Sequence, residues 1–325
     1  MIVVTGGAGF IGSALIAGLN SRGFSDILVV DELACDQKWK NLRNLSFADY
    51  VEKDDFLEMV LAGNVPSGVE TVLHMGACSD TTETNASYLI KNNYEYTKLL
   101  AQWATDDNIR FVYASSAATY GDGSAGFSDD EETVENLRPL NMYGYSKQLF
   151  DLWARRTGLL KKIVGLKYFN VFGPNEYHKG DMRSFVLKAF EQINAAGKVR
   201  LFKSHNPKYA DGEYVRDFLY VKDAVDMSLF FLDKPKLSGL FNIGAGKART
   251  WNDLVSAVFA AMDKKPNIEY IEMPDSIRNQ YQYYTCANII KLRSAGHKKD
   301  PTTLEDAIKD YVQNYLQKSD YLNKR

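Results

Sequence analysis

The stretch VVTGGAGFIGS, residues 3–13, places Gly6, Gly9 and Gly12 between a strand-like apolar run and a helical pattern. Glycines at this spacing let the backbone turn tightly and approach a pyrophosphate, which sits on the N-terminus of the helix. Asp31 closes the next apolar run, DILVVD, where an acid can accept hydrogen bonds from an adenosine ribose. A tight turn that binds nothing is the alternative, but both flanks favour a dinucleotide-binding unit.

Strand-length apolar runs alternate with helical patterns beyond this stretch. The runs include TVLHMGA, RFVYASS and KKIVGLKYFN, and helices are expected over about residues 87–105 and 142–156. Uninterrupted apolar runs are typical of strands buried between two helix layers. The alternation predicts an α/β fold, a doubly wound parallel Rossmann sheet with right-handed crossovers.

The pattern loosens after about residue 170, which predicts a smaller α/β substrate-binding domain interleaved with the first. We expect a helix from Trp251 to Met262 and a strand in NIEYIEMP. The dinucleotide-binding domain is assigned residues 1–169 with about 217–242 and 283–296. The substrate domain is assigned about 170–216, 243–282 and 297–325.

Composition excludes several classes of protein. The 325 residues carry a formal net charge of -2, whereas a general nucleic-acid binder needs an excess of Lys and Arg. No apolar run reaches the roughly 20 residues that span a bilayer, and no signal-peptide pattern is present, so we expect a cytoplasmic protein. The three cysteines and four histidines lack the spacing of metal ligands, so we expect no metal.

Tyr143 and Lys147 in NMYGYSKQLFD are four residues apart and so share one face of the expected helix. The ordinary pKa of tyrosine, about 10, is too high for a base at neutral pH. A nearby lysine ammonium and a positive nicotinamide ring are expected to lower it. Ser116, at the end of the RFVYASS strand, is placed to hydrogen-bond the reacting oxygen. Downstream of a dinucleotide loop, this set predicts hydride-transfer chemistry.

With these motifs the chain resembles the extended short-chain dehydrogenase/reductase family, also described as NAD-dependent epimerases and dehydratases, which act on nucleotide sugars. The resemblance spans essentially the whole chain and rests on TGGAGFIG, HMGACSDTT, NNYEYTKLL, YASSAATYG, YGYSK, YFNVFGP and RDFLYVKDA. Within the family, GACSDTTE and FNVFGPNEYHKG are most similar to the 6-epimerases of ADP-heptose. That similarity implies an isomerase of lipopolysaccharide biosynthesis and a homo-oligomer, for which a pentamer is one expectation.

The resemblance also implies a second acid/base group, Lys179, in the segment HKG. Inverting a carbinol carbon presents the hydroxyl in two places, which one tyrosine does not reach equally well. A buried lysine is suited to this because its pKa falls when it is desolvated. A solvated loop charge is the alternative for Lys179, and the neighbouring His178 is a competing base.

Further contacts are implied at matching positions. The cofactor is expected to be NADP, although Asp31 alone would suggest NAD, because Lys38 and Lys53 are placed to neutralise a 2′-phosphate. Exposed surface lysines are the alternative for both. The remaining expected cofactor residues are Phe10, Ile11, Glu32, Met75, Gly76, Ala77, Cys78, Ser79, Asn92 and Val171, together with Tyr143, Lys147 and Lys179.

The substrate is expected to be an ADP-heptose. Arg216 fits a diphosphate clamp, because a guanidinium binds phosphate bidentately; an ion pair with Asp217 or Asp223 is its alternative. The other expected substrate residues are Ser116, Asn170, Asp181, Lys188, Phe202, Lys203, Ser204, His205 and Tyr281.

Three other functions are alternatives. A 4,6-dehydratase normally carries an Asp-Glu pair where this chain has Ala118 and Thr119, so dehydration is disfavoured. A UDP-sugar 4-epimerase keeps the serine, tyrosine and lysine and stays open, although it would not need Lys179. A non-catalytic NADP-binding sensor commonly loses the Tyr/Lys pair, which is intact here.

Overall fold

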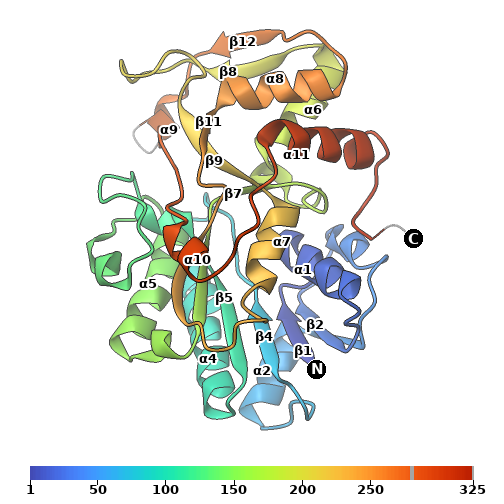
Figure 1. Cartoon of the computed structure of the whole chain (residues 1–325), viewed down its shortest axis with the longest axis vertical. Coiled ribbons are helices and arrows are strands. Elements are labelled where there is room, and N and C mark those ends of the chain that lie inside the picture. The colour runs from blue at the N-terminus through green and yellow to red at the C-terminus, as the bar shows by residue number, and fades with distance from the viewer. Residues whose placement is uncertain (279–281, 324–325) are drawn as a thin grey trace.

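The computed structural model describes residues 1–278 and 282–323. Its main element is a seven-stranded parallel sheet of order β10-β6-β5-β4-β1-β2-β3, which confirms the expected doubly wound α/β fold (Figure 1). The strands are β1 (Ile2–Thr5), β2 (Ile27–Asp31), β3 (Asp49–Glu52), β4 (Thr71–His74), β5 (Arg110–Ser116), β6 (Val164–Tyr168) and β10 (Gly239–Ile243). The strand order reverses between β1 and β4, where ligands of such sheets bind at the carboxyl ends.

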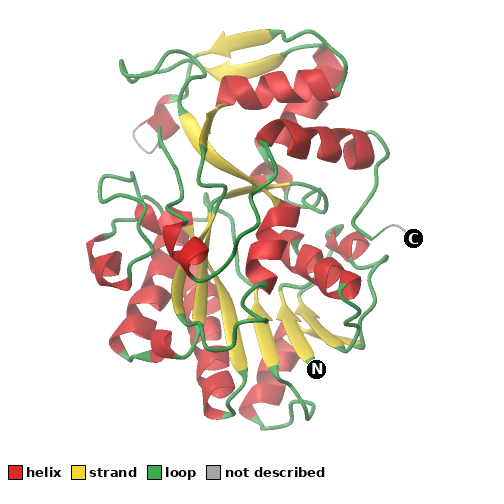
Figure 2. Ribbon diagram, viewed as in Figure 1, coloured by secondary structure: helices red, strands yellow, loops and turns green. Residues whose placement is uncertain are grey.

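Helices cover both faces of this sheet (Figure 2). They are α1 (Phe10–Ser21), α2 (Lys53–Leu61), α3 (Ala86–Leu89), α4 (Tyr96–Asp106), α5 (Met142–Arg156), α7 (Val221–Leu229) and α10 (Ile290–Ser294). Neighbouring residues of β1 serve opposite faces: Val4 packs in one core with Leu15 of α1, and Val3 packs in the other with Leu100 of α4. This division follows from the twofold alternation of side chains along a strand.

The remaining elements form a smaller lobe, drawn in the upper part of Figure 1. Its sheets are β11-β9-β7 and the pair β12-β8. Their bounds are β7 (Asn170–Phe172), β8 (Val199–Phe202), β9 (Val215–Tyr220), β11 (Ala248–Thr250) and β12 (Ile268–Ile271). The lobe's helices are α6 (Phe185–Ala196), α8 (Trp251–Ala261), α9 (Asp275–Arg278) and α11 (Leu304–Asp310). Strand β9 straddles the expected border near residue 217, and the domain borders stay a prediction.

Short helical segments complete the chain. The 3₁₀ turns are η1 (Lys38–Asn41), η3 (Ala117–Tyr120), η4 (Glu131–Asn136), η5 (Leu159–Lys161) and η6 (Gly180–Met182). The π-helical segments are η2 (Ile90–Glu95) and η7 (Tyr311–Leu316). The single helix expected over 87–105 is therefore divided into α3, η2 and α4.

The segment η2 carries a buried contact with another part of the chain. Asn93 is fully buried there, where its amide nitrogen donates to the carbonyl of Cys78 and its amide oxygen accepts from the Cys78 N–H, each at 2.9 Å. The wider turn of a π-segment is often found at functional sites. In this chain it places Asn93 against the loop that follows β4.

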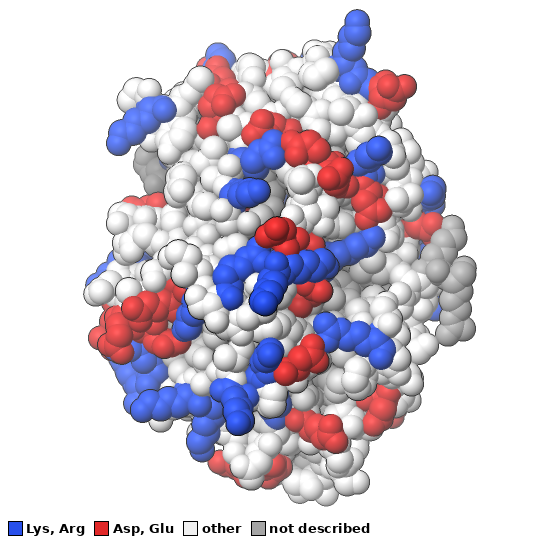
Figure 3. Space-filling model, viewed as in Figure 1, with Lys and Arg blue, Asp and Glu red and all other residues white. Residues whose placement is uncertain are grey.

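Lys and Arg side chains are interspersed with Asp and Glu on the face shown in Figure 3.

None of the helices within the described ranges is both long and apolar enough to cross a membrane. Among the same residues, no three His, Cys, Asp or Glu side chains are grouped so as to hold a metal ion.

Candidate active site

The glycine turn closes against the loop after β4. Gly6 has φ +64°, and a Cβ there would lie 2.6 Å from the backbone nitrogen of Gly76. A Cβ on Gly12 would lie 2.1 Å from the carbonyl oxygen of Gly6. Because neither position has room for a side chain, the turn brings the N-terminus of α1, at Phe10, to the carboxyl edge of the sheet.

Asp31 holds this turn from the end of β2. Its Oδ2 accepts hydrogen bonds from the N–H groups of Ala8 at 2.8 Å and Gly9 at 3.2 Å. Its Oδ1 accepts from the Lys38 ammonium at 2.8 Å. The carboxylate therefore organises the protein's own loop, in addition to the ribose contact that the sequence predicts for it.

A second ion pair, between Lys53 and Glu32, lies beside the pair of Lys38 and Asp31. Lys53 Nζ is 2.6 Å from Glu32 Oε2 and donates to Asn92 Oδ1 at 3.1 Å. The hydrogen bond from Lys53 is the largest influence on the pKa of Glu32, which is lowered. Both Lys38 and Lys53 are thus ordered by carboxylates at the carboxyl end of β2, and both line the cavity described next.

A cavity of about 810 Å³ runs from the glycine turn to α5 and α6. All of the cofactor residues predicted from the sequence line it. They are Gly6, Gly9, Phe10, Ile11, Gly12, Asp31, Glu32, Lys38, Lys53, Met75, Gly76, Ala77, Cys78, Ser79, Asn92, Tyr143, Lys147, Val171 and Lys179. The side-chain-free turn, the helix N-terminus and this lining fit a dinucleotide, and the individual contacts stay predictions.

Tyr143 and Lys147 project from the first turns of α5. The side chain of Asn141 caps this helix by accepting from the Gly144 N–H at 2.8 Å, which fixes where α5 begins. Lys147 is only 4% exposed and donates to the carbonyl of Ala114 in β5 at 2.8 Å. Burial lowers the pKa of Lys147 to about 8, while the negative charge of Asp151 opposes that shift.

Ser116 ends β5 and is close enough to Tyr143 to influence its pKa. In the protein alone the pKa of Tyr143 is not lowered; the lowering expected with the nicotinamide ring stays a prediction. Burial raises that pKa, and the Ser116 hydroxyl offsets the rise only in part. Lys147 donates its hydrogen bond to the backbone of β5.

Lys179 precedes η6 and lines the same cavity, with its Nζ 5.5 Å from the centre of the Phe10 ring. Burial lowers the pKa of Lys179, and the nearby Glu176 carboxylate opposes the change. Glu176 is fully buried and held by the N–H of Gly173 and by the N–H and hydroxyl of Ser184. Lys179 is therefore a partly desolvated ammonium on an anchored loop, the environment that tunes a lysine toward acid/base work.

His178 also lines this cavity, and its Nδ1 lies 3.3 Å from the side-chain amide of Asn41. Burial lowers the pKa of His178 to about 4, which leaves the ring neutral at physiological pH. A neutral imidazole can accept a proton, so His178 stays an alternative base.

A second cavity of about 780 Å³ adjoins the first. Asn170 lines both, and Phe202 and Arg216 line the second. Arg216 donates to the carbonyl oxygens of Val215, at 3.0 Å, and of Gln282. These contacts hold the guanidinium at the cavity wall, as the predicted diphosphate clamp requires.

The alternative partners of Arg216 are engaged elsewhere. Asp217 accepts from the backbone N–H groups of Ala245, Gly246 and Ala287. Asp223 accepts from the N–H and the hydroxyl of Thr302. Both carboxylates therefore serve to join segments of the chain.

The remaining residues predicted to bind substrate lie in different surroundings. Lys188 lines the first cavity and donates to the backbone carbonyl of Asp181 at 2.7 Å, while Asp181 itself is exposed. Lys203 lies 2.7 Å from Glu272 in an exposed ion pair. Asp181, Lys203, Ser204 and His205 line neither of the two cavities, and Tyr281 lies outside the described residues. Substrate contacts at these five positions stay predictions.

Two aromatic residues that line both cavities were not predicted from the sequence. Phe185 of α6 and Trp251 of α8 line both cavities, and their rings meet edge to face with centroids 5.0 Å apart. Trp251 follows Thr250, whose capping box with Asp253 marks the start of α8. That box predicts a helix start, but it carries no signal that the next residue faces a site.

The chain matches known epimerases over nearly its whole length. A profile of the NAD dependent epimerase/dehydratase family matches residues 2–244. A relative from Nitratidesulfovibrio vulgaris named ADP-L-glycero-D-manno-heptose-6-epimerase is 57% identical, over 98% of this chain and 99% of its own. One of the same name from Fusobacterium nucleatum is 48% identical, with 98% and 99% covered.

Solved structures agree with this match. The crystal structure of Helicobacter pylori ADP-L-glycero-D-manno-heptose-6-epimerase superposes with a TM-score of 0.82 at 28% identity, over 96% of this chain and 95% of that one. The similarity inferred from the motifs is thereby confirmed. The chain belongs to the NAD dependent epimerase/dehydratase family.

Proposed function

We propose that the protein is an epimerase that interconverts ADP-D-glycero-D-manno-heptose and ADP-L-glycero-D-manno-heptose at C6″, with bound NADP and no net redox change. The observation that carries the proposal is one cavity that holds both the Ser116, Tyr143 and Lys147 set and the desolvated Lys179. Relatives at 57% and 48% identity bear the name of this activity.

The cofactor would lie with its pyrophosphate at the glycine turn and the N-terminus of α1. Lys38 and Lys53 support NADP over NAD, because both ammonium groups line the end of the cavity at Asp31. When bound, the nicotinamide supplies the acceptance and return of a hydride. Lys147 would hydrogen-bond the ribose next to the nicotinamide, as its place on α5 below Tyr143 allows.

The protein's own groups handle the proton. Tyr143 or Lys179 takes the proton of the C6″ hydroxyl as the carbinol is oxidised to a ketone, while Ser116 hydrogen-bonds the reacting oxygen. The ketone then turns in the cavity and presents its other face. The second group donates the proton as the carbinol is restored, so that the configuration at C6″ is inverted.

The lining of the second cavity supports the proposal that it binds the nucleotide diphosphate of the substrate. Arg216 lies at its wall among apolar and aromatic residues, and Asn170, Phe185 and Trp251 connect it to the first cavity. A guanidinium binds a diphosphate bidentately, and the apolar wall suits a base or a sugar face. The heptose would then extend toward Tyr143 and Lys179.

The test is to incubate purified protein that carries NADP with ADP-D-glycero-D-manno-heptose, without added reductant, and to resolve the 6″-epimers by NMR. Conversion to a mixture of epimers without net formation of NADPH is the expected result. No conversion would overturn the proposal. Conversion of UDP-galactose to UDP-glucose instead would establish the alternative, a UDP-sugar 4-epimerase for which Lys179 is dispensable.

We further propose that the product enters the lipopolysaccharide inner core, and that the protein works as a cytoplasmic homo-oligomer, for which a pentamer is the specific expectation. The names of the relatives support an ADP-heptose as the product. Sedimentation equilibrium of the NADP-bound protein tests the oligomer, and a monomer at micromolar concentration would contradict it.

A further inference from the structure

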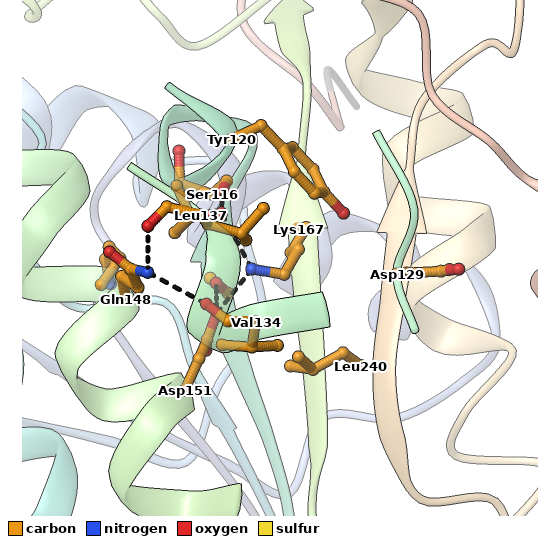
Figure 4. A network of polar contacts seen from close by, with 12 residues as sticks. Ser116, Tyr120, Asp129, Val134, Leu137, Gln148, Asp151, Lys167 and Leu240 are labelled. Atoms are coloured by element: carbon orange, nitrogen blue, oxygen red, sulfur yellow. Dashed lines mark hydrogen bonds and ion pairs between the residues drawn. The ribbon is translucent and has the colours of Figure 1, made fainter. Parts of the chain in front are cut away.

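An ion pair fully excluded from water lies behind the candidate active site. Lys167 of β6 and Asp151 of α5 are both 0% exposed, and their Nζ and Oδ2 atoms are 2.6 Å apart. Figure 4 shows the two side chains pointing toward each other near Ser116. A pair this deeply buried seldom stabilises a fold more than apolar side chains of similar volume, because desolvating two charges is costly. Its position therefore suggests a role other than general stability.

The carboxylate of Asp151 links α5 to the end of β5. Its Oδ1 accepts from the hydroxyl of Tyr113 at 2.8 Å, and its Oδ2 accepts from Ser115 at 2.7 Å. Successive side chains of a strand point to opposite faces. Ala114 and Ser116, which alternate with Tyr113 and Ser115, line the cavity, and Ser115 also borders it. Asp151 therefore fixes the far face of the strand end whose near face carries Ser116.

The ammonium of Lys167 holds the turn that follows Ser116. It donates to the hydroxyl of Thr119 at 2.8 Å, and that hydroxyl donates to the carbonyl of Ser116 at 2.7 Å. The same ammonium lies 5.2 Å from the ring centre of Tyr120. Two buried charges from two elements thus converge on the backbone around Ser116.

Asp151 also acts on Lys147, which is one helical turn earlier on α5. Its negative charge opposes the lowering of the Lys147 pKa that burial causes. Cys78, in the loop after β4, acts in the same direction, and the positive charge of Lys147 adds to the lowering of the His74 pKa that burial causes. Lys167 shares the Asp151 carboxylate, so the two buried lysines depend on one counter-charge.

We propose that Asp151 and Lys167 are positioning residues of the epimerase: together they hold Ser116 and Lys147 in place at the carbinol that reacts. The proposal rests on the proposed function for its reaction. Neither residue touches the cavity, since both side chains are fully buried and absent from its lining. They act through the hydroxyl of Ser116 and the ammonium of Lys147.

The test measures kcat and KM for epimerisation from about pH 6 to about pH 10 in Asp151→Asn and Lys167→Met. Asp151→Asn removes the counter-charge, so the alkaline loss of activity should shift to lower pH. In Lys167→Met, Lys147 no longer shares the Asp151 carboxylate with a second lysine, so the alkaline loss of activity should shift to higher pH. Both variants should lose roughly 10-fold or more in kcat with a smaller change in KM, as expected for a group that acts on the transition state.

Two further variants complete the series. Lys167→Arg keeps the charge and should restore most of the kcat that Lys167→Met loses. Lys291→Met breaks the ion pair of Lys291 with Glu131, 2.6 Å apart at the β10 edge, and should leave the pH profile unchanged. If a single variant does not fold, the double variant Asp151→Asn/Lys167→Met removes both charges together and should fold. Its alkaline loss of activity should stay near that of the wild type, because the two charges act on Lys147 in opposite directions, while kcat should still fall.

A measurement without substrate separates this proposal from the proposed function. The ¹³Cε resonance of Lys147, assigned by its loss in Lys147→Met, reports the titration of that ammonium directly. The midpoint should fall in Asp151→Asn and rise in Lys167→Met, by about one pH unit in each case. Unmoved midpoints, or shifts in the same direction, would overturn the proposal even if the protein epimerises ADP-heptose.

Discussion

Tyr143 and Lys179 bring opposite pKa shifts to one cavity. Burial raises the pKa of the phenol and lowers that of the ammonium, so both shifts favour the neutral forms. A phenol with a raised pKa retains its proton, and a lysine with a lowered pKa releases its proton more readily. This pairing is what an inversion needs, since one proton leaves and another returns at different places.

Tyr143→Phe and Lys179→Met are each expected to reduce the rate of epimerisation by roughly 100- to 10,000-fold, the usual contribution of a general acid or base. Because neither change touches the glycine turn, both variants should still bind NADP, as titrated by fluorescence. Stopped-flow epimerisation assays with an NMR endpoint provide the rates. Full activity of either variant would remove that residue from the proposed mechanism.

His74 makes the stability of the protein sensitive to acid. Its ring is buried between the hydroxyls of Thr5, at 2.6 Å, and Thr97, at 2.8 Å, and burial lowers its pKa to about 3. The unfolded state therefore binds a proton near pH 6.5 that the folded state does not. The neutral His74 ring makes its full contribution to the free energy of unfolding above pH 6.5, and this contribution is lost as the pH falls toward 3.

His74→Gln should weaken this dependence. Between about pH 6 and about pH 4, the free energy of unfolding of the wild type should fall more steeply than that of the variant, by up to about 1.4 kcal/mol per pH unit, the value for one proton. Urea unfolding at a series of pH values measures both slopes. Equal slopes would show that His74 titrates alike in the folded and unfolded states.

At the scale of elements, the glycine turn has the least tolerance for change. Gly12→Ala should lower the free energy of unfolding by about 1–3 kcal/mol, because its Cβ would lie 2.1 Å from the Gly6 carbonyl oxygen and force α1 away. NADP affinity should fall with it. At Gly9 the nearest atom to an added Cβ is at 3.1 Å, so Gly9→Ala is the matched control and should be the more stable variant. The reverse order would contradict this description of the turn.

Much of the sheet was predictable because its strands are buried on both faces. All five residues of β2, ILVVD, are buried, and the sequence shows them as one apolar run. Strand β3, DYVE, is at the edge and only partly buried, so it gives no such signal. The π-segment η2 was not predictable either, because nothing in the local apolar pattern marks it; in the structure its Asn93 contacts Cys78, 15 residues away.

The site was predictable where local spacing fixes it. Tyr143 and Lys147 follow from the helical repeat, and Ser116 follows from the end of a strand. The region around Lys203 could not be predicted, because a polar loop without periodicity does not indicate where it folds. In the structure Lys203 pairs with Glu272, distant in sequence. Trp251 was missed because its role depends on how α8 packs over both cavities.

At the scale of the whole molecule, the larger sheet and the smaller lobe each supply one end of the site. The carboxyl ends of β1, β2, β4 and β5 border the first cavity, and α6, β8 and α8 border the second. Strand β7 follows β6 directly and contributes Asn170 to both cavities. Under the proposed function, this continuity would place a nucleotide sugar, bound mainly by one part, against a cofactor bound by the other.

Cofactor preference can be tested on the whole protein. Lys38→Met and Lys53→Met should each reduce the preference for NADP over NAD by roughly 10-fold, the loss expected when a charge-assisted hydrogen bond to a phosphate is removed. Calorimetric titration with both cofactors measures the ratio. Lys40→Met is the matched control, because Lys40 lies in the same turn, η1, and does not line the cavity. Unchanged ratios in both variants would exclude these lysines as the source of selectivity.

The most direct test of the central claim follows the hydrogen at C6″. ADP-D-glycero-D-manno-heptose with deuterium at C6″ would be incubated with the NADP-bound protein in ordinary water, and the products would be analysed by NMR. If hydride leaves and returns on the opposite face of the ketone, the L-epimer should appear with its deuterium retained and with no net NADPH. Replacement of the deuterium by hydrogen from water, or failure to form the L-epimer, would contradict the account.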